Sequence, residues 1–98
     1  MNFDMIAARD LNRLINDKSA FIIDLRSPEE YVENHIQGAV NIPYEKLQKC
    51  YSLPKDMTLI LYCERGSTSM RAAKELAAKG YRVKTVTGGI HSYYSVLK

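Results

Sequence analysis

The chain has 98 residues, 46% of them apolar and 26% charged, a composition typical of a single globular domain, expected here over residues 1–98. Basic residues are scattered and the net charge is only +3, so neither nucleic-acid nor membrane partners are expected. No apolar run approaches the length of a membrane span, and the first ten residues do not resemble a secretory signal. Two cysteines are too few for a secreted disulfide scaffold and, with the two histidines, show no zinc-finger spacing, which predicts a cytoplasmic protein without a metal site.

Short apolar runs alternate with stretches of helical periodicity along the chain. Apolar residues recur at helical spacing from Met5 to Ile15, which predicts a first helix in this region. Ser27 and Glu30 form a capping box around Pro28, which predicts a second helix start. The full predicted order is a helix over 7–16, a strand at 21–23, a helix over 28–34, a strand at 39–42, a short helix over 44–51, a strand at 58–62, a helix over 69–79, a strand at 82–87 and a helix over 90–97.

This alternation predicts an α/β domain with a mostly parallel sheet. The run at 58–62 is β-rich and almost entirely apolar, as expected of a central strand that is buried on both faces. Ligands of such sheets bind beyond the carboxyl ends of the strands. Cys63, the residue directly after this strand, is therefore a candidate functional residue.

Cys63 is followed by a polar loop and then by a helix, Gly80 standing where that helix should end. The unpaired N–H groups and the dipole at the start of a helix favour a thiolate, which is the nucleophilic form of cysteine. Gly66 permits a tight turn that lets several N–H groups converge on one anion. Ser67, Thr68 and Ser69 add hydroxyl donors and candidate helix caps. The pattern alone leaves open that Cys63 is simply a buried apolar residue.

Several segments resemble, in order and in spacing, those of the rhodanese family, and together they cover nearly the whole chain. Each segment is a weak signal alone, but their combination is specific. They are Asp24-Leu25-Arg26, Glu29-Glu30-Tyr31, His35-Ile36-Gln37-Gly38-Ala39 with Asn41-Ile42-Pro43, Tyr62-Cys63 with Gly66, Ser69 and Arg71-Ala72-Ala73, then Gly80-Tyr81 and Gly88-Gly89-Ile90.

The resemblance implies a five-stranded parallel sheet flanked by helices on both faces, and it implies sulfur transfer. Cys63 would be the nucleophile and would carry sulfur as a persulfide, without a cofactor or a metal. The donor would be thiosulfate or a small-molecule or protein-bound persulfide, and the acceptor a thiol or cyanide. The loop residues expected to bind the donor are Glu64, Arg65, Gly66, Ser67, Thr68 and Ser69, whereas Asp24 and Arg26 would support the structure.

Glu64 departs from the positive charge expected of a loop that binds thiosulfate. We expect its carboxylate, partly offset by Arg65, to weaken the use of this dianion in favour of a less charged donor. Among the other candidates, His35 is interpreted as a helix-end cap and His91 shows no evident partner. Cys50 is a candidate resolving thiol, although nothing near it in the sequence indicates activation.

Two other functions compete with sulfur transfer. A phosphatase or arsenate reductase with a related loop needs an arginine six residues after the nucleophile to grip its oxyanion, and Ser69 occupies that position. A non-catalytic interaction module remains an alternative, although the presence of Cys63 argues against it.

Overall fold

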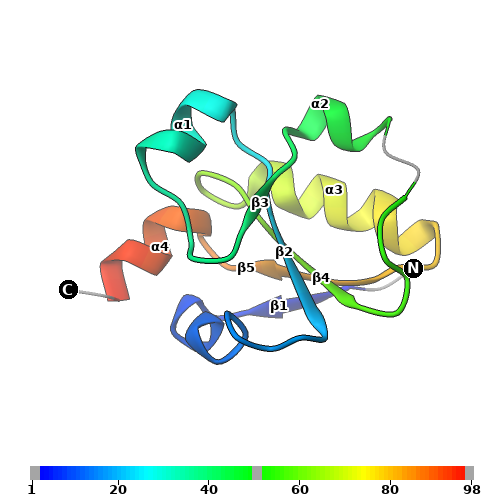
Figure 1. Cartoon of the computed structure of the whole chain (residues 1–98), viewed down its shortest axis with the longest axis horizontal. Coiled ribbons are helices and arrows are strands. Elements are labelled where there is room, and N and C mark those ends of the chain that lie inside the picture. Colours follow the sequence, from blue (N-terminus) through cyan, green and yellow to red (C-terminus); the bar gives the residue numbers. More distant parts are fainter. Residues whose placement is uncertain (1–2, 50–51, 97–98) are drawn as a thin grey trace.

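The strands form one parallel sheet, and helices cover both of its faces (Figure 1). The computed structural model describes residues 3–49 and 52–96. The sheet has five strands in the order β1-β5-β4-β2-β3, with every neighbouring pair parallel, which confirms the expected α/β fold. The elements are β1 (Asp4–Ile6), the 3-10 helix η1 (Ala8–Arg13), β2 (Ala20–Asp24), α1 (Pro28–Glu33), β3 (Val40–Asn41), α2 (Tyr44–Leu47), β4 (Thr58–Tyr62), α3 (Ser67–Ala78), β5 (Arg82–Val86) and α4 (Gly89–Val96).

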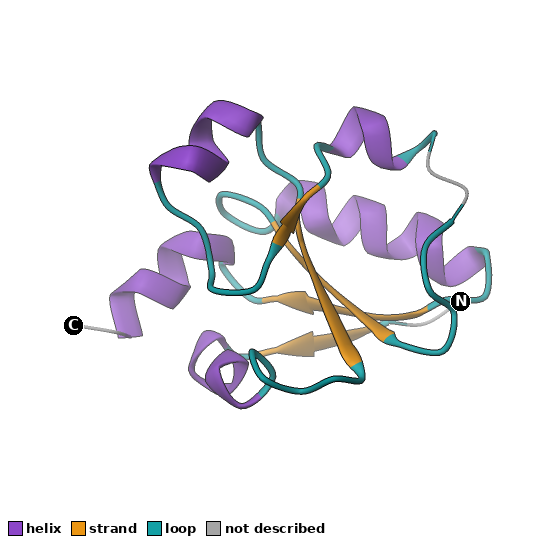
Figure 2. Ribbon diagram, viewed as in Figure 1, coloured by secondary structure: helices purple, strands orange, loops and turns teal. Residues whose placement is uncertain are grey.

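Side chains that alternate along the strands divide the core into two layers. On β4, Leu59 and Leu61 pack with α2 and α3, whereas Ile60 and Tyr62 pack with η1 and α4. Figure 2 shows these helices on opposite sides of the sheet. Because all strands are parallel, their carboxyl ends lie at the same end of the sheet. Because β4 lies in the middle of the sheet order, the residue that follows it emerges between the two helical layers.

The N-terminal segment differs from its prediction. Met5 belongs to β1, an edge strand that pairs only with β5, and not to a helix. The helix predicted over 7–16 is the shorter 3-10 helix η1, with Ala8 and Leu11 as its buried residues. Their spacing of three residues matches the three-residue turn of a 3-10 helix, so an apolar ridge of this period fits η1 as well as an α-helix.

The predicted capping box at α1 is confirmed. The Ser27 hydroxyl accepts a hydrogen bond from the Glu30 N–H at 3.2 Å, and the Glu30 carboxylate accepts one from the Ser27 N–H at 3.1 Å. His35 Nδ1 lies 2.8 Å from the Tyr31 carbonyl oxygen, as expected of a helix-end cap. Across residues 3–49 and 52–96, no helix has both the length and the apolar character needed to cross a bilayer.

A buried polar network joins the carboxyl ends of β2 and β4. The Asp24 carboxylate, which is fully buried, accepts hydrogen bonds from Arg26 Nη2 at 2.9 Å and from the Tyr62 hydroxyl at 2.7 Å. The Tyr62 hydroxyl in turn accepts one from the Ile36 N–H at 3.1 Å, and Arg26 Nη2 donates to the Asn34 carbonyl. Each buried polar group thereby has a partner, which is the condition for burying polar groups without a large penalty.

We predict that Tyr62→Phe lowers the free energy of unfolding by about 1–3 kcal/mol, because the Asp24 carboxylate and the Ile36 N–H each lose a buried partner. Urea denaturation at neutral pH measures this loss. Tyr44→Phe is the control, since the Tyr44 hydroxyl bonds Glu75 at the surface and its removal should cost about 0.5 kcal/mol or less. Equal losses in the two variants would contradict the importance of the buried network.

The same hydroxyl predicts a loss of stability at alkaline pH. Burial, and then the hydrogen bond to Asp24, raise the pKa of Tyr62 well above its ordinary value. A tyrosine in the unfolded chain ionises at about pH 10, so the folded state loses this contribution as the pH rises above that value. Urea titrations at rising pH should therefore show a smaller alkaline loss in Tyr62→Phe than in the wild type.

Candidate active site

The Cys63 sulfur lies at the start of α3 and occupies the place of a helix cap. Its Sγ accepts hydrogen bonds from the Gly66 N–H at 3.1 Å and the Ser69 N–H at 3.4 Å. Gly66 is the N-cap residue, and its φ of +113° is a left-handed conformation that favours glycine. The thiol is buried, with 6% of Cys63 exposed. The sulfur thus takes the Ser69 N–H, which an N-cap oxygen usually takes, and also the N–H of the N-cap residue Gly66 itself.

This arrangement corrects the predicted boundary of α3, which begins at Ser67 and not at Ser69. It also corrects the prediction that a hydroxyl of residues 67–69 caps the helix, because the Gly66 N-cap has no side-chain cap. The Ser69 hydroxyl instead bonds the Gly66 carbonyl at 3.0 Å and Thr85 Oγ1 at 2.6 Å, beneath the loop. The Thr68 side chain faces the thiol cavity, whereas Arg65 and Ser67 are exposed.

The start of α4 holds the loop from the other face of the sheet. The Ile90 N–H donates to the Cys63 carbonyl at 2.9 Å, and the His91 N–H donates to the Glu64 carbonyl at 3.4 Å. Gly89 packs directly on this backbone, so a Cβ added there would lie 2.6 Å from the Glu64 oxygen and closer still to that of Cys63. The loop therefore has its shape fixed by backbone contacts to two helices.

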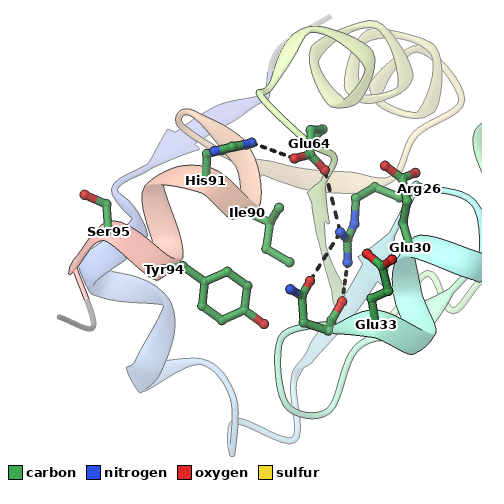
Figure 3. A pocket seen from close by; sticks show the side chains of 9 residues that line it. Arg26, Glu30, Glu33, Glu64, Ile90, His91, Tyr94 and Ser95 are labelled. Carbon is green, nitrogen blue, oxygen red and sulfur yellow. Dashed lines mark hydrogen bonds and ion pairs between the residues drawn. The ribbon is translucent and has the colours of Figure 1, made fainter.

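The Glu64 side chain lies between the His91 and Arg26 side chains. Its Oε2 lies 2.6 Å from His91 Nε2, and its Oε1 lies 3.6 Å from Arg26 Nη1 (Figure 3). His91 therefore does have a partner, contrary to the sequence interpretation. The ion-pair partners of Glu64 are thus His91 and Arg26, whereas Arg65 is exposed.

Two cavities meet at this side chain. One, of about 370 Å³, contains the Cys63 thiol; a larger neighbour of about 500 Å³, drawn in Figure 3, lies between α1 and α4. Arg26, Glu30 and Glu64 line both, so the two hollows adjoin. The thiol cavity is completed by Leu25, Ser27, Tyr44, Glu45 and Thr68, and the larger cavity by Glu33, Asn34, Ile90, His91, Tyr94 and Ser95.

Charge in the thiol cavity is mostly negative. Among the described residues that line the cavity, Arg26 is the only cation, and its guanidinium is already engaged by the buried Asp24 carboxylate. The remaining charged side chains in the cavity lining are Glu30, Glu45 and Glu64. The cavity is therefore acidic although the chain as a whole carries a net charge of +3. These carboxylates would repel an anionic ligand in the cavity.

Comparison with known proteins identifies the domain. Residues 7–95 match the family described as Rhodanese-like domain. The chain belongs to this family. The rhodanese-like domain is 37% identical over 71 residues to the thiosulfate sulfurtransferase PspE of Escherichia coli, covering 69% of this chain and 68% of that protein. It is 34% identical to a tRNA sulfurtransferase of Desulfurococcus amylolyticus over 81% of this chain, but spans only 16% of that protein's length.

Solved structures agree with this assignment. A rhodanese-related protein from Thermoplasma volcanium superimposes with a TM-score of 0.86 at 30% identity, covering 95% of this chain and 92% of that one. The rhodanese-like domain of this chain therefore has the same fold as this relative and is similar to it in sequence. Cys50, the candidate resolving thiol, lies outside the described residues.

We predict that Gly89→Ala destabilises the domain and displaces the Cys63 loop, because the added Cβ would collide with the backbone of residues 63–64. Gly80→Ala is a matched control: Gly80 also has a positive φ, but its Cβ would meet only Lys55 Nζ, at 3.9 Å. The free energy of unfolding of Gly80→Ala should fall only by the conformational cost of about 1–2 kcal/mol, and that of Gly89→Ala should fall further.

Thermal denaturation and the rate of Cys63 alkylation by iodoacetamide measure the two effects. Only Gly89→Ala should change the alkylation rate in the folded protein. If both variants alkylate like the wild type, the contact of Gly89 with the loop has no influence on the thiol.

Proposed function

We propose that this rhodanese-like domain is a sulfurtransferase in which Cys63 accepts sulfane sulfur and passes it to a thiol or to cyanide. The observation that carries the proposal is the Cys63 Sγ itself, which accepts hydrogen bonds from the Gly66 and Ser69 N–H groups while Cys63 lines a cavity of about 370 Å³. Donors in this arrangement stabilise sulfur in its anionic form. The similarity to the thiosulfate sulfurtransferase supports the same chemistry.

The proposed reaction has two half-reactions. The Cys63 thiolate attacks the outer sulfur of the donor, so that a Cys63 S–S bond forms and the donor's S–S bond breaks. With thiosulfate, sulfite leaves with the bonding electron pair, and Cys63 holds a persulfide anion. An acceptor thiolate or cyanide then attacks the outer sulfur, and the Cys63 thiolate leaves. Kinetics should be of the ping-pong type.

The Ser69 side chain argues against the phosphatase alternative. It occupies the position where such an enzyme needs an oxyanion-binding arginine, and its hydroxyl is turned beneath the loop toward Thr85. An interaction module without catalysis remains the second candidate. Substitution of Cys63 separates these functions, since docking should survive loss of the thiol and sulfur transfer should not.

The finer features of the proposal follow from the sequence. We infer a single domain over residues 1–98 that acts in the cytoplasm and needs no cofactor. Arg65 and residues 67–69 contribute to the loop that binds the donor. Asp24 and Arg26 support the structure of that loop. The donor is thiosulfate or a persulfide, and no nucleic-acid contact is expected. Because one relative is named a tRNA sulfurtransferase, tRNA binding by this chain merits a direct assay.

We predict that the reduced protein gains the mass of one sulfur atom when incubated with thiosulfate or with a persulfide donor. Excess cyanide should remove the added mass and release thiocyanate. Intact-mass spectrometry of the wild type and of Cys63→Ser measures the loading, and Cys50→Ser is the matched control.

Loading that is lost in Cys63→Ser and kept in Cys50→Ser would establish Cys63 as the sulfur carrier. Absence of loading from both donors would remove the proposed function and leave the interaction module.

We predict that Glu64→Gln raises kcat/KM for thiosulfate by about three- to tenfold, because it removes one negative charge from the lining of the thiol cavity. Gln is nearly isosteric and can still accept a hydrogen bond from His91. Steady-state assays with cyanide as acceptor measure the change, and unchanged kinetics would remove the proposed charge effect.

A further inference from the structure

His91 holds residue 64 at two points. Its backbone N–H donates to the Glu64 carbonyl at 3.4 Å, and its Nε2 lies 2.6 Å from the Glu64 carboxylate. The first contact belongs to the backbone and survives any substitution at position 91 except proline. The second is short enough for a charge-assisted hydrogen bond, and it is the part that a substitution removes.

His91 is also better placed than Arg26 to pair with Glu64. Arg26, the other candidate, bonds Asp24 through Nε and Nη2, the latter at 2.9 Å, whereas Glu64 lies 3.6 Å from its Nη1. The charged side chains that share the cavity with His91 are Arg26, Glu30, Glu33 and Glu64, and its own helix adds Tyr94 and Ser95. When His91 is protonated, the group formed by Asp24, Arg26, Glu64 and His91 has no net charge; when it is neutral, the group is anionic.

The charge on Glu64 affects the thiol because Glu64 follows Cys63 directly in the chain and lines the same cavity. A carboxylate that is drawn toward α4 and neutralised there repels an approaching anion less than a free one does. The repulsion grows with the charge of the donor, so it discriminates between donors that transfer sulfur by the same chemistry.

We propose that His91 is a positioning residue that sets the donor preference of Cys63: by holding the Glu64 carboxylate toward α4, it lets the thiol accept sulfur from dianionic donors. This inference rests on the proposed sulfurtransferase function and names the residue that controls its choice of donor. His91 acts through Glu64 and needs no contact with the donor.

The test uses two donors that differ in charge. Thiosulfate, a dianion, yields sulfite when its outer sulfur moves to Cys63; methanethiosulfonate, a monoanion, yields methanesulfinate by the same step. The measured quantity is the ratio of kcat/KM for thiosulfate to kcat/KM for methanethiosulfonate, with cyanide as acceptor. General damage to the fold or to the thiol affects both donors alike and cancels in this ratio. All variants are compared at the same pH.

We expect His91→Ala to lower this ratio by about three- to tenfold, as the loss of one compensating charge near a surface site predicts. In a Glu64→Gln background, His91→Ala should have no further effect, because the carboxylate that His91 holds is gone. Glu33→Gln, which removes a carboxylate from the same larger cavity, should change the ratio much less than Glu64→Gln.

An unchanged ratio in His91→Ala, an equal effect of His91→Ala in both backgrounds, or an equal effect of Glu33→Gln and Glu64→Gln would each overturn the inference. If neither donor loads Cys63, the sulfurtransferase function itself falls, and this inference with it.

Discussion

The buried carboxylate of Asp24 is the constraint on which the structure at the carboxyl ends of β2 and β4 depends. A charge with no exposed surface must be paired and hydrogen-bonded, and Arg26 and Tyr62 meet that need from its own chain segment and from the neighbouring strand. Arg26 is thereby brought to the carboxyl end of the sheet, where it faces Glu64. The pairing that stabilises the fold also provides a cation in the lining of the thiol cavity.

The sequence predicted those parts of the fold that local patterns specify. The apolar run at 58–62 and the capping box at Ser27 each carry their own signal, and both are where they were expected. Strand β1 was missed because a three-residue edge strand with two exposed positions leaves no alternating pattern. Its existence depends on pairing with β5, which is distant in sequence.

The candidate site was predictable in its backbone and less so in its charges. Cys63 and Gly66 stand out because a strand, a thiol, a glycine and a helix follow one another in the chain. The contact between Glu64 and His91 joins residues 27 positions apart, and nothing in the sequence near either one indicates the other. The start of α3 was misplaced because the helix uses sulfur, and not a hydroxyl, as its cap. A cysteine three residues before a glycine N-cap is no established capping signal.

The loop after β4 owes its shape to main-chain N–H groups. Gly66 and Ser69, at the start of α3, donate to its sulfur, and α4 donates to its carbonyls. The outward side chains at positions 65 and 67 take no part in that support. The backbone shape of this loop is thus independent of its exposed side chains. The same framework could present a different set of side chains around an unchanged sulfur, which makes these positions a natural place to redesign ligand selectivity without rebuilding the domain.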